Sequence, residues 1–260
     1  MAHPMRRGSS DARHVLVFEK REQVWQFMEE RFREIGEGAV GERGRFSVAL
    51  SGGKTPKDLY VEIAGQGRDM HWKDIHVFLV DERFVPRSTE MSNYGMIEKN
   101  LLQHVPIPDG NIHPIGVKGG DVNAWAAAYE EELLQFFGIL PGSVPAFDLI
   151  LLGMGEDGHT ASLFPGMPDV RNDRRLVRPI EAAGERVARV TLTLRVINSA
   201  RNVFFLVTGE AKAQAVHRVV DEEDPSLPAT LVLPENGALF FLCDAEAGSM
   251  LLAERKINRL

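Results

Sequence analysis

The sequence predicts an α/β fold: a three-layer α/β/α sandwich around a mostly parallel, doubly wound (Rossmann-like) sheet. From residue 14 onward, short apolar runs alternate with longer amphipathic segments along the 260-residue chain, which is typical of this class. Several runs are apolar throughout, as expected for strands that helices cover on both faces. There is no internal repeat and no long linker. We therefore expect one domain over residues 14–260, after a disordered tail of residues 1–13.

The individual elements follow from the same two patterns. The first helix, over 21–35, has Val24, Phe27, Met28, Phe32 and Ile35 at helical spacing. Apolar runs predict strands over 14–18, 46–50, 75–80, 147–152, 187–194, 203–207 and 238–243. Amphipathic segments predict further helices over 56–64, 93–102, 122–137 and 210–220.

Composition limits the classes of partner. The formal net charge of −7 argues against nucleic acid or an anionic membrane surface as the main partner. The apolar run 15–18 behind Arg6 and Arg7 is too short for a signal segment or a membrane span. The single cysteine, Cys243, lies in an apolar run and is expected to be a reduced core residue of a cytoplasmic protein. An anionic small molecule stays possible where basic side chains converge.

The most informative segment is the glycine-dense turn 153–159, which follows the apolar run 147–152. It contains three glycines, two carboxylates and an imidazole, with Asp157 two residues before His159. Glycine permits sharp turns and a close approach of the backbone to a ligand. Acidic groups beside a histidine at the carboxyl end of a strand favour proton-transfer chemistry over packing. We predict that His159 is functional.

A second loop, 51–56, follows the strand 46–50 and precedes a helix. Its residues are Ser51, Gly52, Gly53, Lys54, Thr55 and Pro56. Exposed backbone N–H groups at a helix N-terminus favour a phosphate, and proline suits the first helical position. Val48 occupies the place of the first Walker A glycine, so nucleoside triphosphate binding is disfavoured. The alternative is a plain capped turn.

Three charged residues, Asp81, Glu82 and Arg83, follow the strand 75–80. They are either a solvated loop or, since an apolar segment follows at once, a rigidly held group in which Arg83 orients an oxyanion or carboxylate. Arg189 and Lys212 gain a function only if the fold brings them to the glycine loop.

Other motifs are excluded or weak. Gly153, Gly155 and Gly158 match a dinucleotide pattern, but Glu156 and Asp157 would place negative charge where a pyrophosphate sits. Glu181 lies near the expected distance for a ribose-binding acid, so this rejection is not absolute. No serine-hydrolase elbow and no metal-ligand pattern occurs. The remaining candidate histidines are expected to be surface or packing residues: His71, His76, His104, His113 and His217.

Taken together, the motifs resemble the 6-phosphogluconolactonase family. The matching segments are 51–56, 81–86 with 92–94, 153–166, 189–194 with Asn198, and 208–213. They occur in the family's order over nearly the whole chain. Glucosamine-6-phosphate deaminase is similar, but this chain departs from its pattern at two positions. The deaminase has a glutamate immediately before the proline of its histidine motif, where this chain has Phe164. It also has a tyrosine after its Asp-Glu pair, where this chain has Arg83. A sugar-phosphate sensor of similar fold would carry a helix-turn-helix module, for which the residues before 14 are too few.

The resemblance implies hydrolysis of 6-phospho-D-glucono-1,5-lactone to 6-phosphogluconate without metal or organic cofactor. It supports a hypothesis in which His159 is the general base and Asp157 orients its ring. Arg83 would stabilise the oxyanion or hold the sugar ring, and Asp81 would bind sugar hydroxyls. The phosphate would lie against residues 52–55, with Arg189 and Lys212 supplying charge. Two points stay open: whether Asp157 or Asp81 is the partner of His159, and whether the chain is a monomer or a weak dimer.

Overall fold

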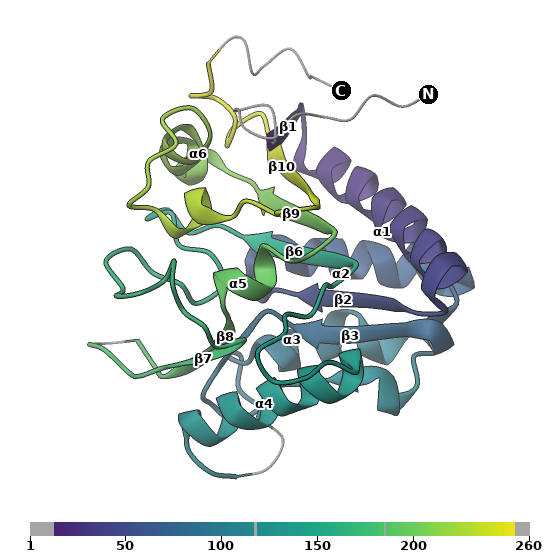
Figure 1. The fold of residues 1–260 in the computed structure, drawn as a ribbon. Helices are drawn as coiled ribbons and strands as arrows, with labels where there is room; N and C mark the ends of the chain where they lie inside the picture. The colour runs from purple at the N-terminus through teal and green to yellow at the C-terminus, as the bar shows by residue number, and fades with distance from the viewer. Residues whose placement is uncertain (1–12, 117–118, 185, 253–260) are drawn as a thin grey trace, which may run out of the picture.

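A seven-stranded parallel sheet forms the centre of the structure, with helices on both sides (Figure 1). This computed structural model describes residues 13–116, 119–184 and 186–252, so residues 1–12 of the predicted tail lie outside it. Neighbouring strands of this sheet pair in parallel, which confirms the predicted fold class. In spatial order the strands are β1 (Arg13–Phe18), β10 (Ala238–Asp244), β9 (Asn202–Val207), β6 (Leu149–Gly153), β2 (Phe46–Leu50), β3 (Ile75–Leu79) and β5 (Ile112–His113).

The predicted helices form, the one over 122–137 at its predicted bounds and the others with shifted ends. Over the described residues they are α1 (Arg21–Arg43), α2 (Lys54–Gln66), α3 (Asn93–Asn100), α4 (Val122–Phe137) and α6 (Ala213–Val220), joined by a short α5 (Leu194–Ile197). Helix α1 runs past its predicted end to Arg43, and Gly36 lets the ring of Phe46 pack close against it. It stops at Gly44, whose φ of 72° is left-handed. The start of the predicted helix 210–220 is a 3₁₀ turn, Glu210–Lys212.

A second, three-stranded sheet lies beside the first and corrects two expectations. It is antiparallel, in the order β4 (Asp81–Arg83), β8 (Arg189–Leu192) and β7 (Val177–Ile180). The predicted strand 187–194 is therefore shorter and does not belong to the parallel sheet, and the charged segment 81–83 is a strand. Val80 joins the sheets, because its N–H donates to Leu50 while its carbonyl accepts from Leu192.

The strand order places a crevice at one edge of the central sheet. From β2 the chain proceeds to β3 and β5 on one side, then returns to β6 on the other side of β2 and continues to β9 and β10. The loops after β2 and β6 therefore leave the sheet in opposite directions. Such a switch in strand order opens a ligand crevice outside the carboxyl ends of the strands. The two glycine-rich motifs occupy these two loops.

Candidate active site

A cavity of about 510 Å³ lies at this switch point. It is bounded by the loops that follow β2, β6 and β9 and by the strands β4 and β8. Every predicted site residue except Asp157 lines it: Ser51, Gly52, Gly53, Lys54, Thr55, Asp81, Arg83, His159, Arg189 and Lys212. The fold thus brings to one place residues that lie far apart in the sequence.

The glycine loop presents backbone donors to this cavity. Gly53 is the N-cap of α2 and has φ 108° and ψ 173°, a conformation that is essentially restricted to glycine. Lys54 is the first residue of the helix and Thr55 the second. The free N–H groups and the positive end of the helix dipole therefore face the cavity, which favours an anion.

Two details of this loop differ from the prediction. Helix α2 begins at Lys54, so Pro56 occupies the third helical position, where its missing N–H is still not needed. The hydroxyl of Ser51 donates to the carbonyl of Leu151 at 2.7 Å, and the hydroxyl of Tyr60 donates to the carbonyl of Ser51 at 2.6 Å. Ser51 thus fixes the loop to β6 and to α2.

The imidazole of His159 is oriented by Asp157. Its Nδ1 lies 2.6 Å from Oδ1 of Asp157, which also accepts the backbone N–H of His159 at 3.1 Å. Burial raises the pKa of Asp157, but these hydrogen bonds from His159 outweigh burial and lower it below its ordinary value. An ionised carboxylate requires a proton on Nδ1, so in the neutral imidazole Nε2 is the acceptor, and it has no hydrogen-bond partner among the described residues. Asp157, and not Asp81, is the partner of His159.

Asp81 lies on the cavity wall in a buried network of its own. Its Oδ2 accepts the hydroxyl of Ser162 at 2.5 Å, and its Oδ1 accepts Nδ2 of Asn93 at 3.2 Å. Ser162 also lies 3.4 Å from Nη1 of Arg189. The sequence alone assigned no role to Ser162 or Asn93, although both fall in segments that match the family.

Two arginines lie side by side on the strands of the small sheet. Arg83 on β4 pairs in register with Arg189 on β8, and both line the cavity. Nη1 of Arg83 donates to the carbonyl of Met91. The Nε atoms of Arg83 and Arg189 are buried and have no hydrogen-bond partner among the described residues. Burial lowers the pKa of Arg189, as does the neighbouring positive charge of Arg83. Both guanidinium groups line the cavity, where their positive charge favours an oxyanion.

The opposite wall comes from the turn after β9. Lys212 lies in the 3₁₀ turn, and its Nζ is 3.8 Å from Oε1 of Glu156. The hydroxyl of Thr208 lies 3.4 Å from that of Thr55, so this turn meets the glycine loop. Lys212 therefore lies beside the N-terminus of α2.

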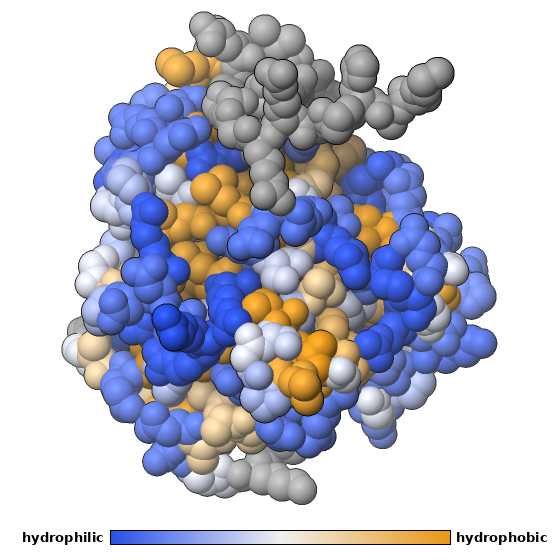
Figure 2. Space-filling view, in the orientation of Figure 1, coloured by the Kyte–Doolittle hydropathy of each residue, from blue (hydrophilic) through white to orange (hydrophobic). Residues whose placement is uncertain are grey.

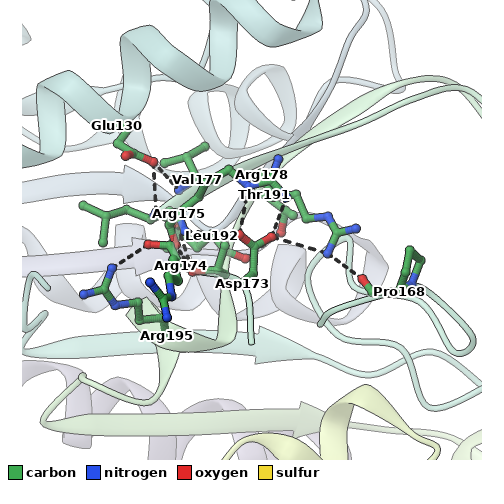
Figure 3. A network of polar contacts seen from close by, with 12 residues as sticks. Glu130, Pro168, Asp173, Arg174, Arg175, Val177, Arg178, Thr191, Leu192 and Arg195 are labelled. Carbon is green, nitrogen blue, oxygen red and sulfur yellow. Dashed lines mark hydrogen bonds and ion pairs between the residues drawn. The ribbon is translucent and has the colours of Figure 1, made fainter. Parts of the chain in front are cut away.

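A network of ion pairs holds the chain between the histidine turn and β7 (Figure 3). The carboxylate of Asp173 accepts from Nε and Nη2 of Arg175 and lies 3.4 Å from Arg178. Glu130 on α4 accepts the backbone N–H groups of Leu176 and Val177. The network fixes β7, which pairs with the strand that carries the cavity's second arginine.

A larger cavity, of about 690 Å³, lies at the other ends of the strands. Its lining includes Arg13 at the start of β1 and Ser199 and Glu235, which precede β9 and β10. Around α5, Figure 2 shows apolar surface bordered by strongly hydrophilic side chains. None of the predicted site residues lines this cavity, and it lies away from the switch point.

Three further expectations concern metals, membranes and the cysteine. Among the described residues, no group of three or more histidine, cysteine or acidic side chains is placed to hold a metal ion. Within the same part of the chain, no helix is long and apolar enough to cross a membrane. Cys243 is buried and free, and burial raises the pKa of its thiol to about 12.

Comparison with protein families identifies the family of this chain. Residues 19–241 match the family described as glucosamine-6-phosphate isomerases/6-phosphogluconolactonase. The chain belongs to this family. Among its relatives, the 6-phosphogluconolactonase of Synechocystis is 44% identical over 215 residues, which cover 82% of this chain and 88% of the relative. The human 6-phosphogluconolactonase is 38% identical over 220 residues, 82% and 83% of the two chains.

Solved structures of the family have the same fold. The crystal structure of 6-phosphogluconolactonase from Thermotoga maritima is 31% identical, with a TM-score of 0.77 over 89% of this chain and 99% of that one. A monomeric glucosamine-6-phosphate deaminase has a TM-score of 0.76 over 91% and 99% of the two chains. It is only 19% identical, so this second likeness shows the fold alone.

Phe164, at which the resemblance to the deaminase led us to compare the two patterns, packs against the proposed base. The centroid of its ring lies 4.8 Å from that of His159. The guanidinium groups of Arg186 and Arg189 lie 4.4 and 5.4 Å from the same ring. An apolar ring therefore packs beside the imidazole.

Proposed function

We propose that this chain hydrolyses 6-phospho-D-glucono-1,5-lactone to 6-phosphogluconate, the second step of the oxidative pentose phosphate pathway. The observation that carries the proposal is the free Nε2 of His159 in the cavity that also contains the N-terminus of α2. A base and an anion site in one cavity fit a phosphorylated ester. The 6-phosphogluconolactonases among the relatives support the same reaction.

The phosphate is assigned to the glycine loop. Backbone N–H groups of residues 52–55 and the helix dipole supply favourable interactions for a dianion. Lys212 adds a positive charge beside them. This local concentration of donors reconciles an anionic substrate with a chain of net charge −7.

The lactone carbonyl is assigned to the histidine end of the cavity. Nε2 of His159 takes a proton from a water whose oxygen attacks the carbonyl carbon. The carbonyl oxygen becomes an oxyanion, which the guanidinium groups of Arg83 and Arg189 on the cavity wall stabilise. The bond between this carbon and the ring oxygen then breaks, and the imidazolium returns the proton to the ring oxygen. His159 thus ends the reaction in the protonation state in which it began, while Asp157 stays ionised beside it.

No step in this scheme uses a metal ion or an organic cofactor. The partner in this proposal is a small phosphorylated sugar lactone. We also propose that the protein acts in the cytoplasm, which a single reduced cysteine in the core supports.

A lactonase assay on the purified protein tests the function. Freshly generated lactone is mixed with the wild type and with His159→Ala, and 6-phosphogluconate is measured against the uncatalysed background. We expect clear acceleration by the wild type and a loss of about 10²–10⁴ in turnover for the variant. A wild-type rate equal to the background, or an unchanged rate for His159→Ala, would overturn the proposal.

The same preparation distinguishes the deaminase alternative. Ammonia release from glucosamine 6-phosphate is measured beside lactone hydrolysis. Because Phe164 occupies the position of the deaminase carboxylate, we expect no ammonia release above the blank. Ammonia release faster than lactone hydrolysis would favour the other branch of the family.

A further inference from the structure

Asn93 has a side chain on the cavity wall that the scheme above does not use. It is the first residue of α3 and is 2% exposed. The buried carboxylate of Glu82 accepts the backbone N–H groups of Asn93 and Tyr94 at 2.8 Å each, and Ser92 caps the helix. These contacts fix the backbone of residue 93 against β4, so its side chain has a defined place.

The direction of the carboxamide is set by its donor end. Nδ2 donates to the backbone carbonyl of Asp81 at 2.8 Å and to its Oδ1 at 3.2 Å. Since only the nitrogen of an amide donates, the oxygen must point away from both Asp81 oxygens. Oδ1 is buried and has no hydrogen-bond partner among the described residues.

This free oxygen lies against the glycine loop. A Cβ placed on Gly52 would be only 1.8 Å from Oδ1 of Asn93. Asn93 lines the same cavity as the glycine loop and Asp81. The ring of a six-carbon substrate phosphorylated at its end would extend from the loop past this position.

We propose that Oδ1 of Asn93 accepts a hydrogen bond from a hydroxyl of the sugar ring and makes Asn93 a specificity-determining residue. The inference rests on the proposed function. An amide oxygen accepts but cannot donate, so it repels phosphate and carbonyl oxygens and selects a hydroxyl. A site built to bond a hydroxyl discriminates strongly against substrates that lack it, because its polar group is then left unpaired.

A purely structural role for Asn93 must be separated from contact with the substrate. Asn93→Ala removes both the bond to Asp81 and the free oxygen, so a lower rate alone decides nothing. The deciding measurement is kcat/KM for the parent lactone and for its 2-, 3- and 4-deoxy analogues, with wild type and with Asn93→Ala. Thermal unfolding of both proteins checks that they fold.

For the wild type, we expect kcat/KM for one deoxy analogue to be about 10- to 100-fold lower than kcat/KM for the parent lactone. For Asn93→Ala, we expect kcat/KM for the same analogue to be close to that for the parent. Asn100→Ala, at the far end of the same helix, where Nδ2 donates to the carbonyl of Met96, is the matched control and should keep the wild-type pattern. Equal losses for every analogue in wild type and Asn93→Ala would overturn the inference, because the rate loss would then be structural.

The outcome stays separate from that of the proposed function. If the wild type hydrolyses the parent lactone but Asn93→Ala shows the same relative kcat/KM values for the deoxy analogues, the proposed role of Asn93 is wrong and the proposed function stands. If the wild type does not hydrolyse it, calorimetric binding of 6-phosphogluconate and its deoxy analogues replaces turnover. Asn93→Ala must then abolish the affinity difference for one analogue, and an unchanged difference for all three would overturn the inference.

Discussion

The carboxamide oxygen of Asn93 occupies the space into which a side chain at residue 52 would project. A Cβ on Gly52 would lie 1.8 Å from Oδ1 of Asn93, whereas one on Gly53 would meet nothing closer than 3.9 Å. The two glycines are therefore required for different reasons. Gly52 permits close contact between the glycine loop and the first residue of α3, and Gly53 adopts a φ of 108° that a side chain would strain.

We predict that Gly52→Ala lowers kcat/KM by about 10²-fold, because displacing Asn93 and the loop by about 1 Å misplaces the substrate. The loss should be smaller when Gly52→Ala is added to Asn93→Ala, since the clash is then removed. Steady-state kinetics of the two single variants and the double variant measure this coupling. Equal losses in both backgrounds would show that the contact does not matter.

Gly65→Ala is the control for the glycine substitution. Gly65 lies inside α2, and a Cβ there would meet nothing within 4 Å. Alanine should therefore stabilise the helix by about 0.5–1 kcal/mol and leave kcat/KM unchanged. A loss of activity at this position would indicate that any change in α2 disturbs the site.

Asp157→Asn tests the orientation of the imidazole. The carboxylate fixes the proton on Nδ1 of His159, whereas a carboxamide can also donate to Nδ1 and so favour the wrong tautomer. We expect kcat to fall by about 10²–10⁴, with KM little changed, because the group does not line the cavity. A raised KM with unchanged kcat would assign Asp157 to substrate binding.

The central fold was predictable because its strands are buried on both faces. Continuous apolar runs predicted β1, β2, β3, β6, β9 and β10, apart from shifted ends. The small antiparallel sheet was not predictable in the same way. Strand β4 consists of three charged residues, and β7 contains Pro179, which disfavours a strand. Its strands form through pairing with distant residues, which no local pattern encodes.

The candidate site was predictable where glycine and charge follow a strand. The loop after β2 and the turn before His159 lie at strand ends, and both line the cavity. The position of Asn93 depends on contacts with Asp81 and Gly52 that only the folded chain makes. Two adjacent glycines indicate a close approach of some group, and the fold identifies that group as a carboxamide.

Lys212 and Glu156 should have opposite effects on phosphate binding. Lys212→Ala removes a positive charge beside the glycine loop, so KM should rise about tenfold or more with little change in kcat. Glu156, 3.8 Å from Nζ and largely exposed, competes with the phosphate for Lys212. Glu156→Gln should therefore lower KM, by less than about fivefold because the pair is exposed to solvent. Both KM values are measured at constant ionic strength, and an unchanged KM for Lys212→Ala would contradict the assignment.

His76 should make the folded state sensitive to acid. Burial, together with the charges of His113 and Arg45, lowers its pKa from 6.5 to about 4. Between these values the unfolded chain binds a proton at residue 76 that the folded protein does not, so stability falls as the pH falls from about 6.5 to about 4.

His76→Gln removes this titration and should flatten the dependence of unfolding free energy on pH in that range by up to one proton. Urea unfolding of wild type and variant at several pH values measures the slopes, and the difference at pH 8 gives the packing cost of the substitution alone. The ring centroids of His76 and Phe136 are 4.7 Å apart, and Nδ1 of His76 lies 3.2 Å from Nε2 of His113. Protonation therefore places a charge in a half-buried position beside another imidazole. Parallel curves for the two proteins would show that another group carries the acid sensitivity.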